Sequence, residues 1–231
     1  NVDVQPGEVI EAHMLDVRSP GQGLQPNRKW EIIGRPARRR LAAGDILFHS
    51  DLGQQVSKAR NFDFGRSFGI PIRYHDLASL TQLSNFDLLE FHLSYRDLQE
   101  DEAKYFIDVY DMDLLVHAPE LFEGDHILDL CSPDDAYRKL SIEKLSEVIE
   151  VTKRLKRWFS RAERPRIIVN AGGFSQDKPL DKLDRRARYE MILDSLGQLD
   201  LRDVEIIPQT MPPFPWHFGG QRYQNLFVDP D

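Results

Sequence analysis

Apolar and polar positions alternate along most of the chain in segments of strand or helix length. From residue 69 onward, five apolar runs of strand length are followed by polar residues, at 69–77, 86–94, 112–120, 165–173 and 204–212. Helical stretches lie between them at 99–111, 141–162 and 186–199. In 141–162 the apolar residues recur at three- and four-residue steps, which predicts one buried helix face. Ser141, followed by Glu143, is a reasonable start for that helix.

The repeated order of strand, helix and strand predicts a parallel α/β sheet covered by helices on both faces. An open doubly wound sheet and a (β/α)8 barrel are the two candidates. No glycine-rich phosphate loop follows any strand, which disfavours a nucleotide-binding sheet. Polar residues end every strand, where a barrel carries its functional groups. We therefore expect a partial barrel of about five β/α units over 69–231, incomplete at its C-terminus.

The first 52 residues show a different pattern of apolar and polar residues. Short β-like runs such as "EVIEAHMLDV" and "WEIIGRPA" are broken by Gly and Pro, and no long helical period is present. This pattern predicts a small β-rich domain over 1–52, joined to the barrel by a polar linker over 53–68. The chain begins with Asn1 and ends abruptly, so we expect it to be the C-terminal portion of a longer protein.

Composition limits the classes of partner and the cellular compartment that we expect for the chain. The 231 residues carry a formal net charge of −8, which argues against nucleic acid as a partner. No window approaches the roughly 18 apolar residues of a membrane span, and no signal peptide opens the chain. The single cysteine fits a reducing compartment. We expect a cytoplasmic protein with no membrane partner.

Candidate chemistry lies at the strand ends. His117 ends the run "MDLLVH", and it could be a metal ligand, a sugar-binding group or a packed imidazole. Glu90 and His92 alternate with Phe91, so both point to one face of their strand, either into a pocket or as a structural ion pair. His75 and Asp76 could form a helix cap or a ligand pair.

The stretch 210–227 combines three prolines with several aromatic residues. Aromatic faces beside amide and guanidinium groups would suit a sugar ring, and an arginine could hold a phosphate or carboxylate. This makes Trp216, His217 and Arg222 candidate substrate-binding residues, with Asn225 nearby. Packing against an adjacent domain is the alternative.

The first region contains a "GEVI" opening, a "SPGQGL" loop and an "IIGRPARRRLAAGD" core. In this combination of motifs it resembles the SAF, or antifreeze-like, domain of bacterial sialic acid (N-acetylneuraminate) synthases. Such synthases condense phosphoenolpyruvate with an N-acylated sugar in a separate barrel that precedes this domain. The resemblance implies that Arg18 contacts the sugar's acyl group in a partner subunit, and hence a homodimer through the SAF and synthase domains. The chain reads "RSPG" where the family often reads "RPG", which places Arg18 one residue out of step.

The second region is similar to the xylose-isomerase-like and endonuclease-IV-like TIM barrels, in which a strand ending in His-Ala-Pro supplies a metal-site histidine. The resemblance implies metal ligands at His117 and at two further strand ends, where this chain has Asn170 and Gln209. Amides are poor ligands for divalent metals but suit sugar hydroxyls. We therefore expect a degenerate metal site, no cofactor, and substrate contacts from Arg73, His75, Asn170 and Gln209.

These resemblances together predict part of a sialic-acid-synthase-like protein of nonulosonic acid and surface polysaccharide biosynthesis. Its barrel would act on a sugar or sugar phosphate as an isomerase or epimerase, with Glu90 as the general base and His92 or His117 as the acid partner. The alternative is a non-catalytic barrel that binds sugar or acts as a scaffold. DNA repair by analogy with endonuclease IV is disfavoured, because that chemistry requires a full metal cluster.

Overall fold

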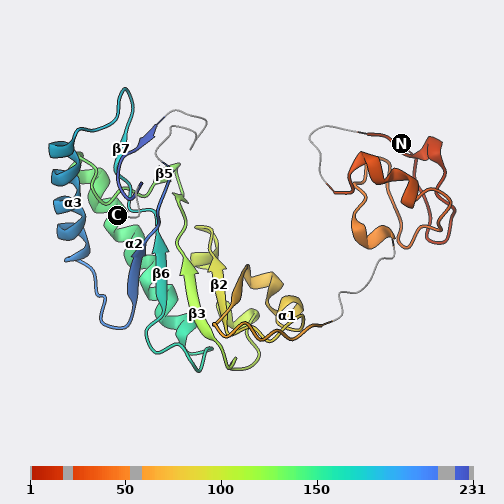
Figure 1. Ribbon diagram of the computed structural model, residues 1–231, viewed down its shortest axis with the longest axis horizontal. Helices are drawn as coiled ribbons and strands as arrows, with labels where there is room; N and C mark the ends of the chain where they lie inside the picture. The colour runs from red at the N-terminus through yellow and green to blue at the C-terminus, as the bar shows by residue number, and fades with distance from the viewer. Residues whose placement is uncertain (1, 18–22, 53–58, 213–221, 229–231) are drawn as a thin grey trace. The chain divides into compact units, whose positions relative to one another are not determined.

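The computed structural model describes residues 2–17, 23–52, 59–212 and 222–228 (Figure 1). The chain divides into two compact units, Asn1–Ala59 and Arg60–Asp231. None of the helices in these described ranges combines the length and apolar character needed to cross a bilayer.

The first unit is held together by short 3₁₀ helices and isolated strand bridges. Antiparallel bridges join Val4 to Leu41 and Val9 to Pro36. Glycines and prolines interrupt each run, so the pairing stays at single bridges in the described residues and does not extend into a ladder. The 3₁₀ helices are η1 (Ala12–Met14), η2 (Pro26–Glu31) and η3 (His49–Leu52). The buried core consists of Val4, Ile10, Ile32, Ala37 and Leu41.

The second unit is built on a five-stranded parallel sheet. Its strands, in spatial order, are β1 (Gly69–Ile72), β2 (Leu88–His92), β3 (Asp113–His117), β6 (Arg166–Val169) and β8 (Glu205–Pro208). Every neighbouring pair is parallel, so all carboxyl ends lie at one edge. This is the arrangement of a partial (β/α)8 barrel, and the predicted fold class is confirmed. Each strand is shorter than its predicted run because the polar ends leave the ladder.

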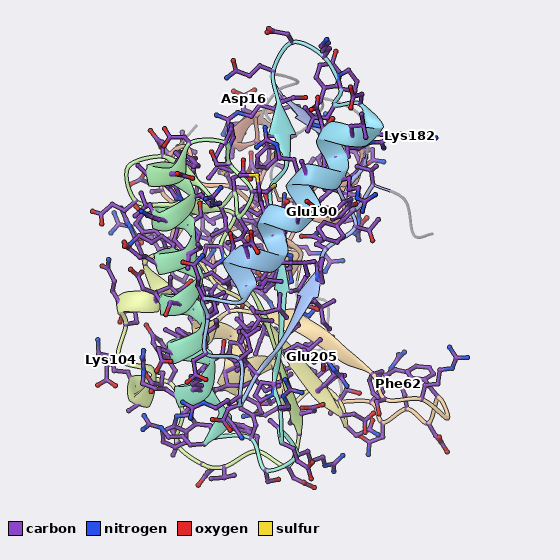
Figure 2. All side chains as sticks on the ribbon, turned by 90° about the vertical axis from the view of Figure 1, so that its left-hand side faces the viewer. Asp16, Phe62, Lys104, Lys182, Glu190 and Glu205 are labelled. Carbon is purple, nitrogen blue, oxygen red and sulfur yellow. The ribbon has the colours of Figure 1, made fainter. Side chains whose placement is uncertain are left out.

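Helices cover one face of this sheet. The α-helices are α1 (Leu77–Leu80), α2 (Asp135–Lys156) and α3 (Lys182–Leu196), and α2 and α3 lie side by side on that face (Figure 2). Leu145 of α2 packs in one core with Leu89 and Leu114 of the sheet. On β2 and β3 the alternate positions are only half-buried. The expectation of helices on both faces is therefore wrong for the described residues, because the second face corresponds to a barrel interior.

Helix α2 begins six residues before the predicted start. The side chain of Asp134 accepts hydrogen bonds from the backbone N–H groups of Ala136 (2.9 Å) and Tyr137 (3.2 Å), which caps the helix. Ser141 lies inside the helix, fully buried, and its hydroxyl donates to the Tyr137 carbonyl at 3.1 Å. The prediction that Ser141 starts the helix is therefore wrong, as is its extension beyond Lys156.

The predicted helix over 99–111 is also wrong. The region holds only two 3₁₀ turns, η5 (Asp97–Gln99) and η6 (Glu102–Lys104). Phe106 leaves the turn and stacks on Trp158, with ring centres 5.6 Å apart. Tyr110 hydrogen-bonds through its backbone to Trp158 and Ser160. Burial of these aromatic rings thus overrides the local helical pattern.

Two antiparallel pairs lie beyond the carboxyl ends of the main strands. They are β4 (Leu121–Phe122) with β5 (His126–Ile127), and β7 (Phe174–Ser175) with β9 (Tyr223–Gln224), and the turn η4 (Tyr74–Asp76) follows β1. The chain turns after β6 through Gly172 (φ 90°) and Gly173 (φ 88°). A Cβ on Gly172 would lie 2.2 Å from an Asp129 carboxylate oxygen, and one on Gly173 would lie 2.5 Å from Leu226 Cγ. Glycine is therefore required at both positions.

Candidate functional site

Two histidines stand side by side at the carboxyl ends of adjacent strands. His92 of β2 is in direct register with His117 of β3. Their rings stack with centres 4.6 Å apart and an interplanar angle of 20°. Parallel strands turn in-register side chains to the same face, so both imidazoles lie on the face that helices do not cover.

Glu90 completes a dyad with His92 on that face. The two residues are two positions apart on β2, and Nε2 of His92 lies 2.7 Å from Oε1 of Glu90. A carboxylate only accepts, so the imidazole Nε2–H donates this bond. The Glu90 side chain is 25% exposed and that of His92 is 40% exposed, which leaves both reachable by a small molecule. The sequence offers two interpretations of Glu90 and His92, namely that they point into a pocket or that they form an ion pair. The structure is compatible with both, because the two side chains are hydrogen-bonded to each other and also accessible.

The ring of His117 is oriented by its own backbone. Its Nδ1 lies 3.1 Å from the Ala118 carbonyl oxygen, which can only accept a hydrogen bond. The proton of the neutral ring therefore lies on Nδ1, and the Nε2 lone pair is left to accept a proton or a hydrogen bond. Such a fixed tautomer is typical of histidines in acid–base sites.

Asn170 and Gln209 lie at the ends of β6 and β8, where the family resemblance implies metal ligands. Asn170 is 5% exposed, and its side-chain oxygen accepts a hydrogen bond from Gly172 N–H at 3.2 Å. The side-chain oxygen of Gln209 is buried and has no partner among the described residues. One amide is thus engaged in the turn, and the other has a buried acceptor that the described residues leave unpaired.

The donor set does not fit a divalent metal. Within the described residues, no group of three or more His, Cys, Asp or Glu side chains could hold a metal ion. The Asn170 oxygen already accepts a backbone hydrogen bond, and neutral amides compensate poorly for the charge of a cation. We therefore assign no step of the chemistry to a metal.

A buried carboxylate that sequence reasoning missed supports the strand-end turn. Oδ1 of Asp129 accepts hydrogen bonds from Gly173 N–H (3.0 Å) and Cys131 N–H (3.1 Å). Burial raises the pKa of the Asp129 carboxyl, and these hydrogen bonds act in the opposite direction. The same burial raises the pKa of the Cys131 thiol, which keeps it unreactive. The glycine pair at 172–173 is the one signal in the sequence for so close an approach.

The other predicted site residues are dispersed. Arg73, which follows β1, lies 3.5 Å from the Asp97 carboxylate at the same edge as His92. Asp76 accepts a hydrogen bond from Arg73 N–H at 3.2 Å, so it acts as a cap, and His75 is 74% exposed beside it. Arg222 lies over the Phe174 ring at 5.8 Å. The predicted residues Arg18, Trp216 and His217 lie outside the described residues.

Asn225 is not available to a ligand. Its side-chain oxygen accepts from Leu180 N–H at 2.8 Å, and its amide nitrogen donates to the Gly173 carbonyl at 2.9 Å and to Ser175. The residue is 4% exposed. The expectation that this amide meets a sugar hydroxyl is therefore wrong, since it fastens β7 and β9 to the turn after β6.

Comparison with known families assigns both parts of the chain. Residues 1–53 match the SAF domain, and residues 79–227 match the family described as xylose isomerase-like TIM barrel. Neither a curated protein nor a solved structure matches the chain significantly. A SAF domain joined to such a barrel indicates a sugar-processing or biosynthetic protein. The second match covers more than half of the sequence, and the chain belongs to the xylose isomerase-like TIM barrel family.

Proposed function

We propose that the barrel part is a metal-independent sugar isomerase or epimerase that uses Glu90, His92 and His117 for acid–base catalysis. The observation that carries the proposal is the Glu90–His92 hydrogen bond of 2.7 Å, together with the His117 ring stacked on that of His92. Acid–base catalysis next to a carbonyl needs one group to take a proton from carbon and another to give a proton to oxygen. The dyad and the second imidazole supply both.

The proton transfers balance within these three residues. The free oxygen of Glu90 takes the proton from the carbon next to the substrate carbonyl, and the C–H electron pair forms the carbon–carbon double bond of an enediol. The carbonyl oxygen takes a proton from a protonated imidazole, His92 or His117. To form the isomer, Glu90 returns its proton to the former carbonyl carbon, while the hydroxyl oxygen of the neighbouring carbon gives its proton to the imidazole and becomes the new carbonyl. To form the epimer, the first oxygen gives its proton back to the imidazole, and the second imidazole, in its protonated form, protonates the neighbouring carbon on the opposite face.

Polar side chains at the strand ends favour a polyhydroxylated substrate, either a sugar or a sugar phosphate. In this proposal the buried side-chain oxygen of Gln209, which has no partner among the described residues, accepts a hydrogen bond from a hydroxyl of the bound substrate. Arg73 is 46% exposed at the same edge and supplies a cation for a phosphate. The side-chain oxygen of Asn170 already accepts a hydrogen bond from Gly172 N–H in the turn after β6. In this proposal Asn170 therefore supports the shape of the site more than it contacts the substrate.

We further propose that the chain is part of a sialic-acid-synthase-like protein of nonulosonic acid biosynthesis in the cytoplasm. The match of residues 1–53 to the SAF domain supports this proposal, together with the sequence resemblance of that region to the synthase family. In this proposal the SAF unit closes over a sugar bound by a partner subunit of a homodimer, and Arg18 contacts the acyl group.

A barrel that binds sugar without turning it over is the second candidate. Asn170 and Gln209 favour it, because they stand where the metal ligands of the resemblance would stand and suit hydroxyl groups. Binding without turnover would leave the Glu90–His92 pair as a recognition element.

Solvent exchange tests the catalytic proposal directly. The chain is incubated in D₂O with hexose 6-phosphates and N-acetylhexosamine 6-phosphates, and deuterium at the carbon next to the carbonyl is followed by NMR. We expect exchange by the wild type and a loss of about 100-fold or more in Glu90→Gln. The matched control is Glu205→Gln, which removes a carboxylate at the amino end of β8. Binding without any exchange would instead establish the non-catalytic function.

The synthase context has its own test. Arg18→Ala in the complete protein is expected to weaken binding of the N-acylated sugar, measured as a higher KM in the condensation with phosphoenolpyruvate. Lys104→Ala, a surface change in the second unit, is the control. An unchanged KM for the sugar in Arg18→Ala would remove this residue from the substrate contacts.

A further inference from the structure

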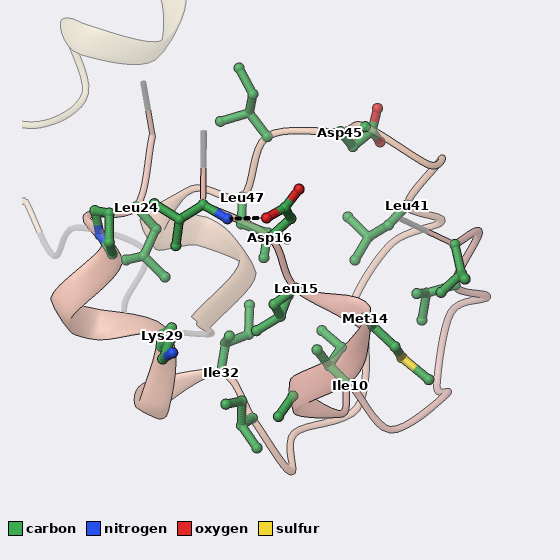
Figure 3. A pocket seen from close by; sticks show the side chains of 18 of the residues that line it. Ile10, Met14, Leu15, Asp16, Leu24, Lys29, Ile32, Leu41, Asp45 and Leu47 are labelled. Atoms are coloured by element: carbon green, nitrogen blue, oxygen red, sulfur yellow. Dashed lines mark hydrogen bonds between the residues drawn. The ribbon is translucent and has the colours of Figure 1, made fainter. Parts of the chain in front are cut away.

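The first unit contains a cavity that the strand-end chemistry does not use (Figure 3). Its volume is about 410 Å³, within the range of roughly 300–1,000 Å³ that small-molecule sites occupy. The cavity is lined entirely by residues of this unit, so its existence does not depend on the second unit.

The walls of the cavity are mainly apolar. Core residues Ile10, Ile32 and Leu41 line it, and each is buried against the rest of the unit. Val17 and Ile46 also line it, yet they are 58% and 39% exposed. Apolar surface is therefore left in contact with water around a concave site, and a ligand that covers it is favoured by the hydrophobic effect.

The carboxylates that line the cavity have hydrogen-bond or ion-pair partners within the chain. Asp45 is engaged by Arg39 at 3.0 Å and by Ala42 N–H at 3.1 Å. Asp16 accepts a hydrogen bond from Val17 N–H at 2.9 Å. These carboxylates already have donors within the chain.

Lys29 is the one cation among the lining residues in the described part of the unit. Its ammonium lies 4.6 Å from the centre of the Trp30 ring, and the ion pairs between described residues do not include it. Trp30 is 69% exposed and also lines the cavity. The aromatic face holds the ammonium beside the apolar walls and leaves its N–H donors for an external acceptor.

We propose that this cavity is a binding site for a small amphipathic carboxylate. An aliphatic or aromatic body covers the apolar walls, and the carboxylate accepts charge-assisted hydrogen bonds from the Lys29 ammonium. Apolar walls alone would accept any hydrophobic molecule, so Lys29 gives the site its preference for an anion. This site is separate from the proposed isomerase or epimerase chemistry and does not rest on it.

The test compares three probes of one length: hexanoate, 1-hexanol and hexylamine. Methyl NMR of the complete 231-residue chain follows Ile10, Ile32 and Met14 in the cavity, with Ile167 and Ile192 of the second unit as internal controls. We expect saturable shifts of the cavity methyls only, with hexanoate binding about five- to tenfold more tightly than 1-hexanol. Hexylamine should bind most weakly.

Two variants distinguish the contribution of the Lys29 charge to binding from that of the apolar walls. Lys29→Gln should reduce hexanoate affinity to that of 1-hexanol, while Lys153→Gln in the second unit should change nothing. Ala42→Trp, at an exposed lining position, should block both probes. Native methyl dispersion of Ile10 and Ile32 shows that each variant is folded, and Lys29→Met replaces Lys29→Gln if that dispersion is lost. Equal affinity for hexanoate and 1-hexanol, shifts confined to the second unit, or no saturable shift would each overturn the proposal.

Discussion

The two units of the chain bury their apolar residues in different ways. In the second unit, α2 and the parallel strands share one continuous core, which includes fully buried Leu89, Leu114 and Leu145. Among the described residues of the first unit, the buried core has five members, and part of its apolar surface lines an open cavity. The strand ends of the second unit can therefore hold side chains in fixed geometry, whereas the first unit leaves apolar surface that a ligand can cover.

This comparison explains why the candidate chemistry lies where it does. The Glu90–His92–His117 geometry is set by the register of two central strands, and both strands are anchored on their other face by buried residues. Precise acid–base geometry needs such support from rigid elements. Binding of an amphipathic molecule depends less on angles, and the cavity of the first unit can provide it.

Truncation of a core side chain in either unit should have the largest effect on the free energy of unfolding. Leu145→Ala should lower the free energy of unfolding of the second unit by about 2–5 kcal/mol, because a fully buried side chain leaves a cavity between α2 and the sheet. Ile32→Ala should lower that of the first unit by a similar amount, which for about 59 residues approaches the total expected stability of roughly 3–9 kcal/mol.

Urea unfolding followed by ¹⁹F NMR of 5-fluorotryptophan separates the two effects, since Trp30 reports on the first unit and Trp158 on the second. Each substitution should move one transition and leave the other in place. Leu193→Ala, at a position 68% exposed on α3, is the control and should move neither. A common shift of the transitions reported by Trp30 and Trp158 would contradict the division into two units.

Glycine substitution in the strand-end turn should have the next largest effect. Gly173→Ala combines a positive φ with a Cβ 2.5 Å from Leu226 Cγ, and should destabilise the second unit by about 2–3 kcal/mol. Gly124→Ala has a positive φ of 74° but no atom within 4 Å of the added Cβ, so it should lose only about 1 kcal/mol. Thermal unfolding measures both. Equal losses would show that the close packing of the turn contributes nothing.

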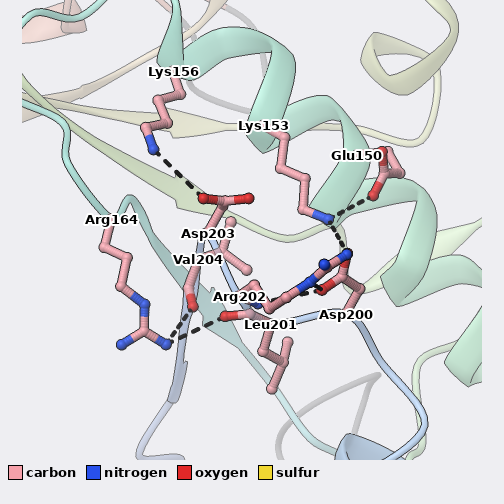
Figure 4. Close-up of polar contacts among 9 residues, drawn as sticks. All are labelled: Glu150, Lys153, Lys156, Arg164, Asp200, Leu201, Arg202, Asp203 and Val204. Carbon is pink, nitrogen blue, oxygen red and sulfur yellow. Dashed lines mark hydrogen bonds and ion pairs between the residues drawn. The ribbon is translucent and has the colours of Figure 1, made fainter.

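Substitutions in charge pairs should give the smallest effects, and the main cause of the lowered carboxyl pKa differs between the two units. In the second unit, hydrogen bonds from Arg202 and then Lys153 hold the pKa of Asp200 below its usual range (Figure 4). In the first unit, the Ala42 N–H is the larger cause of the lowered pKa of Asp45, ahead of Arg39. Arg202→Gln should therefore raise the pKa of Asp200 clearly, whereas Arg39→Gln should raise that of Asp45 only in part.

NMR titration of the two carboxyl groups measures these shifts. A carboxyl whose folded pKa is lowered stabilises the fold above its unfolded pKa of about 3.9, and this contribution is lost as the pH falls towards the folded pKa. Both contributions should thus be present at neutral pH and disappear in acid. A larger shift for Asp45 than for Asp200 would contradict the assignment of causes.

Much of the fold could be predicted from the sequence because its strands are apolar runs with abrupt polar ends. The positions of Glu90, His92 and His117 followed from the period-two alternation of β2 and the end of β3. The start of α2 was missed because Asp134 and Ser141 are both acceptable caps, and only tertiary packing decides that Ser141 is buried. The helix predicted over 99–111 failed because its aromatic residues are more stable in the core.

Buried charge was the feature least visible in the sequence. Glu102 lies in an acidic stretch that predicts a solvated side chain, yet it is 4% exposed and pairs at 2.7 Å with Arg157, the residue that follows α2. Asp129 likewise follows an ordinary apolar segment, and only its contact with Gly173 reveals its role. Long-range partners of this kind leave no local pattern.

The most direct test of the central claim is solvent exchange by the chain after exhaustive treatment with a chelator, with residual metal measured by mass spectrometry. A metal-independent acid–base site predicts that deuterium exchange persists at its full rate in the metal-free wild type and is lost in Glu90→Gln. Loss of exchange on chelation, with recovery on adding zinc or manganese, would contradict the account.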